Sequence, residues 1–148
     1  MIKVFISHSS GDREFVTGEL RPLLQSHDIE AWCSEVDIES AEDWERSIRV
    51  GLNTSSWFLV VLTPNAVTSR WVKAEVQWAC TNRWNRIISL RLTDCRPDQL
   101  HLQLPLVQSV DYRWRDETAR HRLLNVFGVD PSDQHSKMGR GMPLVIIV

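Results

Sequence analysis

Cysteine is scarce in this sequence, and the few cysteines lie far apart. The 148 residues include only Cys33, Cys80 and Cys95, which form no C-x-x-C pair and no spacing typical of metal ligands. The pattern argues against a disulfide-bonded scaffold and against a structural metal site. A sparse, odd set of thiols fits a reducing compartment, so we expect a cytoplasmic protein that holds no metal.

Long apolar runs and a strong excess of charge are also missing. No run approaches the roughly 20 residues that a membrane-spanning helix needs. The strand-like residues 2–6 follow the first residue at once, which leaves no room for a signal peptide. The formal net charge of -2 is too mild for the concentrated basic surface that binds nucleic acid or an anionic membrane. We therefore expect neither as a partner.

Buried strands alternate with helices along the chain, which is long enough for one domain with a core. The strongest strand is residues 57–62, and its unbroken apolar character indicates that both faces of the sheet are covered. The other predicted strands are residues 3–7, 29–33, 86–92 and 106–110, and the predicted helices start near Ser10 and Ser40 or span 65–82 and 116–127. This alternation predicts a doubly wound parallel sheet in the order 2-1-3-4-5, with helices on both faces.

The first predicted helix carries a capping signal and a breaking signal. Ser10 is expected to be its N-cap residue. Pro22 lacks a backbone donor and clashes with the carbonyl oxygen four residues earlier, that of Gly18. We therefore predict a kink or a broken last turn.

An acidic side chain between two indoles is the main candidate for chemistry. Helical spacing places Trp71, Glu75 and Trp78 on one face, and the helix leaves one of the two loops that border the predicted crevice. Those loops begin at Ser7 and Thr63. Glu75 is either a solvated surface acid or a functional carboxylate in this crevice, and the crevice position favours function. Trp71 is either core or site wall, whereas Trp78 fits packing better.

The loop after the first strand is rich in polar side chains. Ser7, Ser9 and Ser10 either cap the following helix or donate hydrogen bonds to a ribose or phosphate. His8 invites assignment as a base, but a loop histidine is commonly just exposed. Residues 37–45 are acidic and form either a solvated loop or an assembly surface.

Several segments, in this order, resemble the Toll/interleukin-1 receptor (TIR) domain family. They are Val4-Phe-Ile-Ser-His-Ser-Ser-Gly-Asp12, Ile29-Glu-Ala-Trp32, Asp37-Ile38 with Trp44 and Ile48, Phe58-Leu-Val-Val-Leu-Thr-Pro-Asn65, and Ser69-Arg-Trp71 with Glu75. The resemblance covers about residues 1–127 and implies a flavodoxin-like fold. Residues 128–148 would then be a tail, either an added edge strand or the start of a further domain.

The resemblance implies cleavage of NAD+ between nicotinamide and ribose, as in bacterial members of the family. NAD+ would be the substrate, with no separate cofactor, and Glu75 would be the catalytic residue. Substrate contacts are then expected from Ser7, His8, Ser9, Ser10, Trp32, Trp44 and Trp71. In the family's BB loop, about residues 34–43 here, self-association would involve Glu35, Val36, Asp37, Ile38 and Glu39. Many members have a glycine in this loop, and residues 39–42 supply none.

Two other functions are compatible with the same sequence. Many animal TIR domains are adaptors without catalytic activity that bind other TIR domains. A nucleoside deoxyribosyltransferase relative would also place a carboxylate against a ribose. The resemblance further implies a role in prokaryotic defence or stress signalling, with a fused or partner sensor or effector domain.

Overall fold

Five parallel strands form the centre of the protein. The computed structural model of the chain describes residues 1–33 and 44–131. The strands are β1 (Lys3–Ser7), β2 (Glu30–Cys33), β3 (Trp57–Leu62), β4 (Ile87–Arg91) and β5 (Gln108–Asp111). They pair in the order β2-β1-β3-β4-β5, and every pair is parallel. The predicted fold class, strand order and parallel pairing are therefore confirmed.

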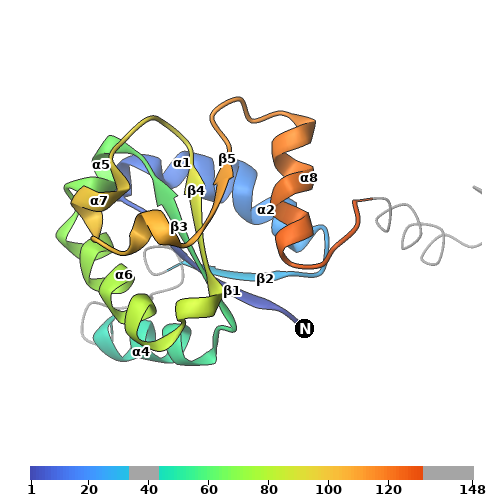
Figure 1. The fold of residues 1–148 in the computed structure, drawn as a ribbon. Coiled ribbons are helices and arrows are strands. Elements are labelled where there is room, and N and C mark those ends of the chain that lie inside the picture. Colours follow the sequence, from blue (N-terminus) through green and yellow to red (C-terminus); the bar gives the residue numbers. More distant parts are fainter. Residues whose placement is uncertain (34–43, 132–148) are drawn as a thin grey trace, which may run out of the picture.

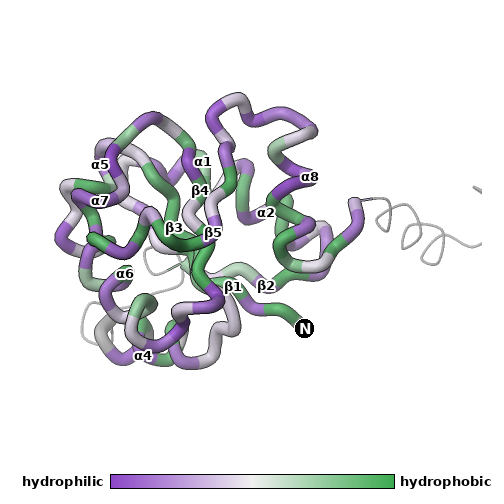
Figure 2. Tube along the Cα trace, in the orientation of Figure 1, coloured by the Kyte–Doolittle hydropathy of each residue, from purple (hydrophilic) through white to green (hydrophobic). Residues whose placement is uncertain are grey.

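Helices cover both faces of this sheet (Figure 1). One face carries α1 (Arg13–Phe15), α2 (Arg21–Gln25) and α8 (Glu117–Val126). The other carries α4 (Trp44–Thr54), α5 (Pro64–Val67), α6 (Arg70–Asn82) and α7 (Pro97–Leu100). Each face has its own hydrophobic core: the first core lies under α1, α2 and α8, and the second under α4 to α7. Successive strand residues point to opposite faces, so Val4 and Ile6 belong to the first core and Phe5 to the second. The hydrophobic colour in Figure 2 accordingly concentrates on the strands between the helical layers.

The first helical segment adapts to Pro22 in an unexpected way. A 3-10 turn (Ser10–Asp12) and α1 lead into a π-helical stretch, Val16–Leu20, where the Arg21 N–H donates to the carbonyl five residues back. This wider register changes the position of the carbonyls that an α-helix would aim at the proline ring. The last turn stays intact, since the Ser26 N–H donates to the Pro22 carbonyl at 2.9 Å. The predicted kink is thus a π-helical stretch.

Other element boundaries correct the sequence predictions. Ser10 is not the N-cap residue; Ser9 holds that position, and its hydroxyl donates to Asp12 instead of capping. The helix predicted over residues 65–82 is two helices, because the Ser69 hydroxyl accepts from the Val72 N–H and starts α6 separately. α7 lies between the last two strands, where no helix is predicted, and the last strand begins at Gln108 rather than near residue 106.

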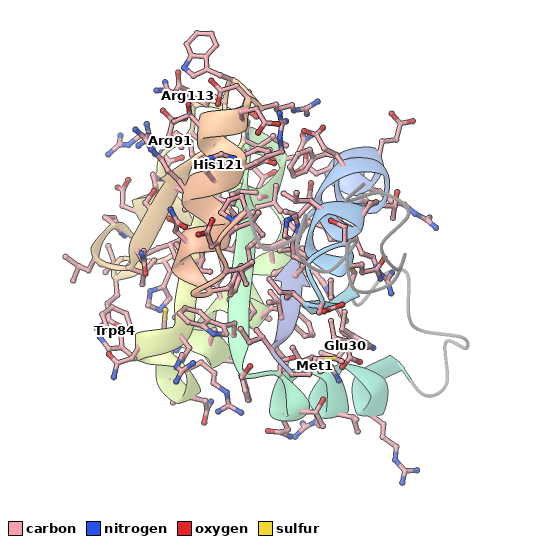
Figure 3. The ribbon with its side chains drawn as sticks, turned by 90° about the vertical axis from the view of Figure 1, so that its right-hand side faces the viewer. Met1, Glu30, Trp84, Arg91, Arg113 and His121 are labelled. Carbon is pink, nitrogen blue, oxygen red and sulfur yellow. The ribbon has the colours of Figure 1, made fainter. Side chains whose placement is uncertain are left out.

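The strands all begin at one edge of the sheet and end at the opposite edge. In Figure 3, Met1 and Glu30 lie at the edge where β1 and β2 begin, with Trp84, which precedes β4. Arg91 and Arg113, at the ends of β4 and β5, lie at the opposite edge. Open parallel sheets place ligands outside this carboxyl edge, where the strand order reverses between β1 and β3. In the described part of the chain, no helix is both long and apolar enough to cross a membrane.

Candidate active site

A buried serine–glutamate pair lies at the carboxyl end of β1. Ser7 follows Phe5 by two residues, so its side chain lies on the sheet face that α6 covers. The Ser7 hydroxyl donates to Oε1 of Glu75 at 2.7 Å. Ser7 is fully buried and Glu75 is only 4% exposed. Glu75 is therefore not a solvated surface acid, and a strand-end hydroxyl fixes one of its carboxylate oxygens.

Glu75 also lines a cleft between α4 and α6, two helices that lie on the same side of the sheet in Figure 1. The cleft has a volume of about 340 Å³, within the range of small-molecule sites. Its walls are Ile48, Arg49, Leu52, Asn53, Trp71, Ala74, Glu75 and Trp78. The lining is mostly apolar and aromatic, with three polar side chains. A ligand with flat rings and a ribose suits such a surface.

Arg83 joins the two helices that form the cleft. From the end of α6, its guanidinium donates to the carbonyls of Asn53 and Ser55, each at 3.2 Å, just where α4 ends. The same group lies 5.2 Å from the centre of the Trp78 ring, in a cation–π contact. Arg83 therefore fixes the separation of the helix ends and braces one aromatic wall.

The depth of α4 on the sheet depends on Gly51. A Cβ atom at this position would lie 2.8 Å from two carbons of the Trp32 ring. That ring packs in turn on Phe5, with ring centres 5.1 Å apart. The absence of a side chain at Gly51 thus lets α4 sit directly on Trp32.

The loop after β1 is held by hydrogen bonds to one carboxylate. Oδ2 of Asp12 accepts from the hydroxyls of Ser9, at 2.7 Å, and Thr63, at 2.6 Å. Thr63 follows β3, so this contact joins the two loops where the strand order reverses. The Nδ1–H of His8 donates to the Ser9 carbonyl at 2.8 Å. Nε2 is buried and has no hydrogen-bond partner among the described residues.

The predicted site residues separate into three groups. Trp71 joins Glu75 in the cleft wall and also packs on the second core. Ser7, His8 and Ser9 are buried at the end of β1, whereas Ser10 is exposed. Trp32 lies beneath α4 and is not among the residues that line the cleft.

The remaining predicted residues lie beyond what the structure describes. Trp44 begins α4, but its side chain is outside the described part of the chain. The predicted assembly residues are outside it as well: Glu35, Val36, Asp37, Ile38 and Glu39.

Sequence reasoning missed Arg49, Asn53 and Arg83. Arg49 and Asn53 are four residues apart on α4, and both flank the inward-facing Leu52, so helical spacing alone would have placed them beside the buried face. Arg83 carries no such signal, because its bonds join positions about thirty residues apart. In the described ranges, no group of three or more histidine, cysteine or acidic residues is arranged to hold a metal ion.

A model of one protein family, the TIR domain, matches residues 4–124. Curated relatives include the 2' cyclic ADP-D-ribose synthase BtTIR of Bacteroides thetaiotaomicron, 25% identical over 81 residues, and the NAD(+) hydrolase TcpA of Theionarchaea archaeon (strain DG-70-1), 33% identical over 73 residues. The matches cover 55% and 49% of this chain but only 28% and 22% of those relatives. The chain therefore spans less than a third of their length.

Solved structures with a similar fold come from animals and prokaryotes. The TIR domain of the Toll-related receptor TRR-2 from Hydra magnipapillata superposes with a TM-score of 0.63 at 19% identity, over 84% of this chain and 94% of that one. A prokaryotic SEFIR domain superposes with a TM-score of 0.65 at 14% identity, over 88% and 95% of the two chains. At these identities the likeness concerns the fold alone.

Proposed function

This chain belongs to the TIR domain family, and we propose that it cleaves NAD+ at the bond between nicotinamide and ribose, with Glu75 as the catalytic residue. The observation that carries the proposal is the buried Ser7–Glu75 pair at the wall of the cleft between α4 and α6. The activities of the curated relatives, NAD(+) hydrolase and 2' cyclic ADP-D-ribose synthase, support the same substrate. The proposed setting is a cytosolic signalling protein in prokaryotic defence.

The chemistry needs a single carboxylate. Nicotinamide departs as a neutral ring, so no acid has to protonate the leaving group, in contrast to the two carboxylates of an ordinary glycosidase. As the bond breaks, positive charge grows on the ribose ring. The Glu75 carboxylate would stabilise that charge, and the Ser7 hydroxyl would keep one carboxylate oxygen in place. Charge stabilisation of this kind requires neither a metal nor a cofactor.

The walls of the cleft would serve the same reaction. The indoles of Trp71 and Trp78 offer flat surfaces for nicotinamide or adenine and exclude water from the carboxylate. Trp71 would influence whether the ribose carbon is captured by water or by another part of the same nucleotide, giving a linear or a cyclic product.

The test is incubation of the concentrated protein with NAD+, with nicotinamide and ADP-ribose species resolved by mass spectrometry. We expect the parent chain to release nicotinamide and Glu75→Gln to release it at least about a hundredfold more slowly, the usual scale for loss of one transition-state contact. Glu14→Gln, which makes the same change at an exposed helical position, is the control and should match the parent. Equal rates for parent and Glu75→Gln would refute the assignment. A parent chain inactive at every concentration would favour an adaptor without catalytic activity.

A further inference from the structure

The cleft carries one positive and one negative side chain, at different depths. Among its lining residues in the described part of the chain, Glu75 is the carboxylate and Arg49 is the cation. Glu75 is buried on α6 and bonded to the end of β1, whereas Arg49 is exposed on α4. A ligand that fits this arrangement places positive charge deep in the cleft and negative charge toward solvent.

NAD+ has that distribution of charge. Its nicotinamide is a pyridinium, and its diphosphate lies beyond the ribose that carries this ring. We infer that Arg49 binds the phosphate groups of the dinucleotide, an inference that rests on the proposed function and adds a specificity to it. The site would select nicotinamide nucleotides over nicotinamide riboside, which has the same scissile bond and no phosphate. A guanidinium suits this role because its fork of donors matches phosphate oxygens.

Two contacts set the position of α4, the helix that carries Arg49, beside α6. Arg83 bonds the end of α6 to the end of α4, and Gly51 seats α4 against Trp32. Both contacts lie within the described residues and hold the helix that carries Arg49. With the two helices held together, the exposed Arg49 side chain extends from the same cleft wall on α4, and the phosphates of a ligand whose ribose contacts Glu75 could lie near it.

Arg46 provides a matched control for charge on the same helix. It lies three residues before Arg49, is also exposed and is not among the residues that line the cleft. Arg49→Gln and Arg46→Gln therefore remove the same charge from neighbouring positions on α4. A general electrostatic attraction would respond to both changes, and a direct phosphate contact only to the first.

Binding is measured by calorimetry with ADP-ribose and with adenosine, which lacks phosphate. We expect Arg49→Gln to weaken ADP-ribose binding by about tenfold or more, as for loss of a charge-assisted hydrogen bond, and to leave adenosine binding within about twofold. Arg49→Lys should recover part of the loss, and Arg46→Gln should bind as the parent does. In turnover assays, Arg49→Gln should raise KM for NAD+ and lower kcat/KM for nicotinamide riboside by less than about twofold.

Binding and turnover give separate outcomes. Equal losses in Arg49→Gln and Arg46→Gln, no loss in either, or equal losses for ADP-ribose and adenosine would each overturn the phosphate contact. Failure of the parent to bind ADP-ribose at millimolar concentration would overturn it too. A parent that binds ADP-ribose through Arg49 and yet releases no nicotinamide would uphold the contact and refute the proposed reaction.

Discussion

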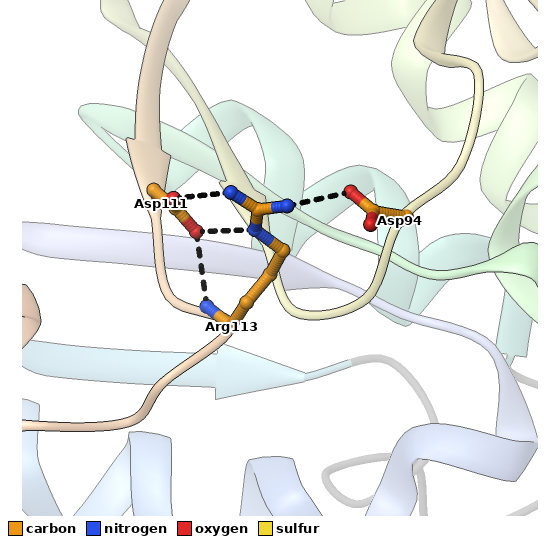
Figure 4. A network of polar contacts seen from close by, with 3 residues as sticks. All are labelled: Asp94, Asp111 and Arg113. Atoms are coloured by element: carbon orange, nitrogen blue, oxygen red, sulfur yellow. Dashed lines mark hydrogen bonds and ion pairs between the residues drawn. The ribbon is translucent and has the colours of Figure 1, made fainter.

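Arg113 illustrates how single side chains join the loops at the carboxyl edge of the sheet. Its guanidinium donates to both oxygens of Asp111 at 2.9 Å and to Asp94, from the loop after β4, at 2.9 Å (Figure 4). Hydrogen bonds from the Arg113 side chain and backbone lower the pKa of Asp111 from 3.8 to about 2. The sequence shows Asp111 and Arg113 two residues apart, but it gives no sign that a second loop supplies Asp94.

The depressed pKa of Asp111 predicts a pH dependence of stability. Because the folded value lies below the unfolded one, the contribution is fully present above about pH 4 and is lost as pH falls through about 2. Carbon NMR should show Asp111 titrating near pH 2 in the parent and closer to 3.8 in Arg113→Gln. In urea unfolding, the stability difference between the two proteins should shrink as pH is lowered. Arg96→Gln, which removes an exposed pair with Asp98, is the control and should leave the Asp111 titration unchanged.

The same limit of sequence reasoning applies to the candidate site. The helical spacing of Trp71 and Glu75 was visible in the sequence and holds in the structure, because spacing within one helix depends only on local geometry. The hydrogen bond from Ser7 and the opposite wall on α4 depend on tertiary contacts, which one sequence does not reveal. The packing of Trp32 beneath α4, against Gly51, is a tertiary contact of the same kind, and its predicted contact with substrate stays a prediction.

Among the helices, α4 and α6 determine the shape of the cleft. The inward positions of α4 were predictable from periodicity, and Ile48, Gly51 and Leu52 are indeed buried. The break between α5 and α6 was not predicted, since the apolar spacing continues across residues 65–82 and only the Ser69 cap divides it. The sequence predicts only a kink at the π-helical stretch. Pro22 shows that a regular α-helix would clash there, but the packing around the helix decides how the backbone avoids the clash.

Replacement of Gly51 and of Gly18 by alanine should have opposite effects on stability. Gly51→Ala places a methyl group against the Trp32 ring, so we expect a net loss of about 1–3 kcal/mol in the free energy of unfolding, typical of overpacking. Gly18→Ala meets no atom within 4 Å and should stabilise the protein by a few tenths to about 1 kcal/mol. Urea denaturation measures both. A Gly51→Ala protein as stable as Gly18→Ala would show that α4 is not seated on the indole as described.

For the whole molecule, the strand order fixes where chemistry can occur. The alternation of strands and helices sufficed to predict the order β2-β1-β3-β4-β5 and hence the crevice beside β1 and β3. The likeness to receptor TIR and SEFIR domains at 14–19% identity shows how little the fold depends on particular side chains. The activity depends on the site instead. We retain residues 1–127 as the proposed domain; residues 132–148 lie outside the described part of the chain.

Self-association should affect the activity of the molecule as a whole. If residues 35–39 contribute to self-association, as proposed from the family resemblance, nicotinamide release per molecule should rise with protein concentration. Ile38→Asp should shift that dependence to higher concentration without changing the melting temperature by more than a few degrees. Light scattering alongside the assay provides the check. A specific activity that stays constant from nanomolar to high micromolar protein would indicate a site complete within one chain.

We propose that Glu75, buried beside Ser7 in the wall of the cleft, acts in breaking the nicotinamide–ribose bond of NAD+. The most direct measurement is the rate of nicotinamide release by the parent chain and by Glu75→Gln, at the same high concentration and with matching circular dichroism spectra. We expect release by the variant to be about a hundredfold slower or more. Undiminished release by a folded Glu75→Gln protein would contradict it.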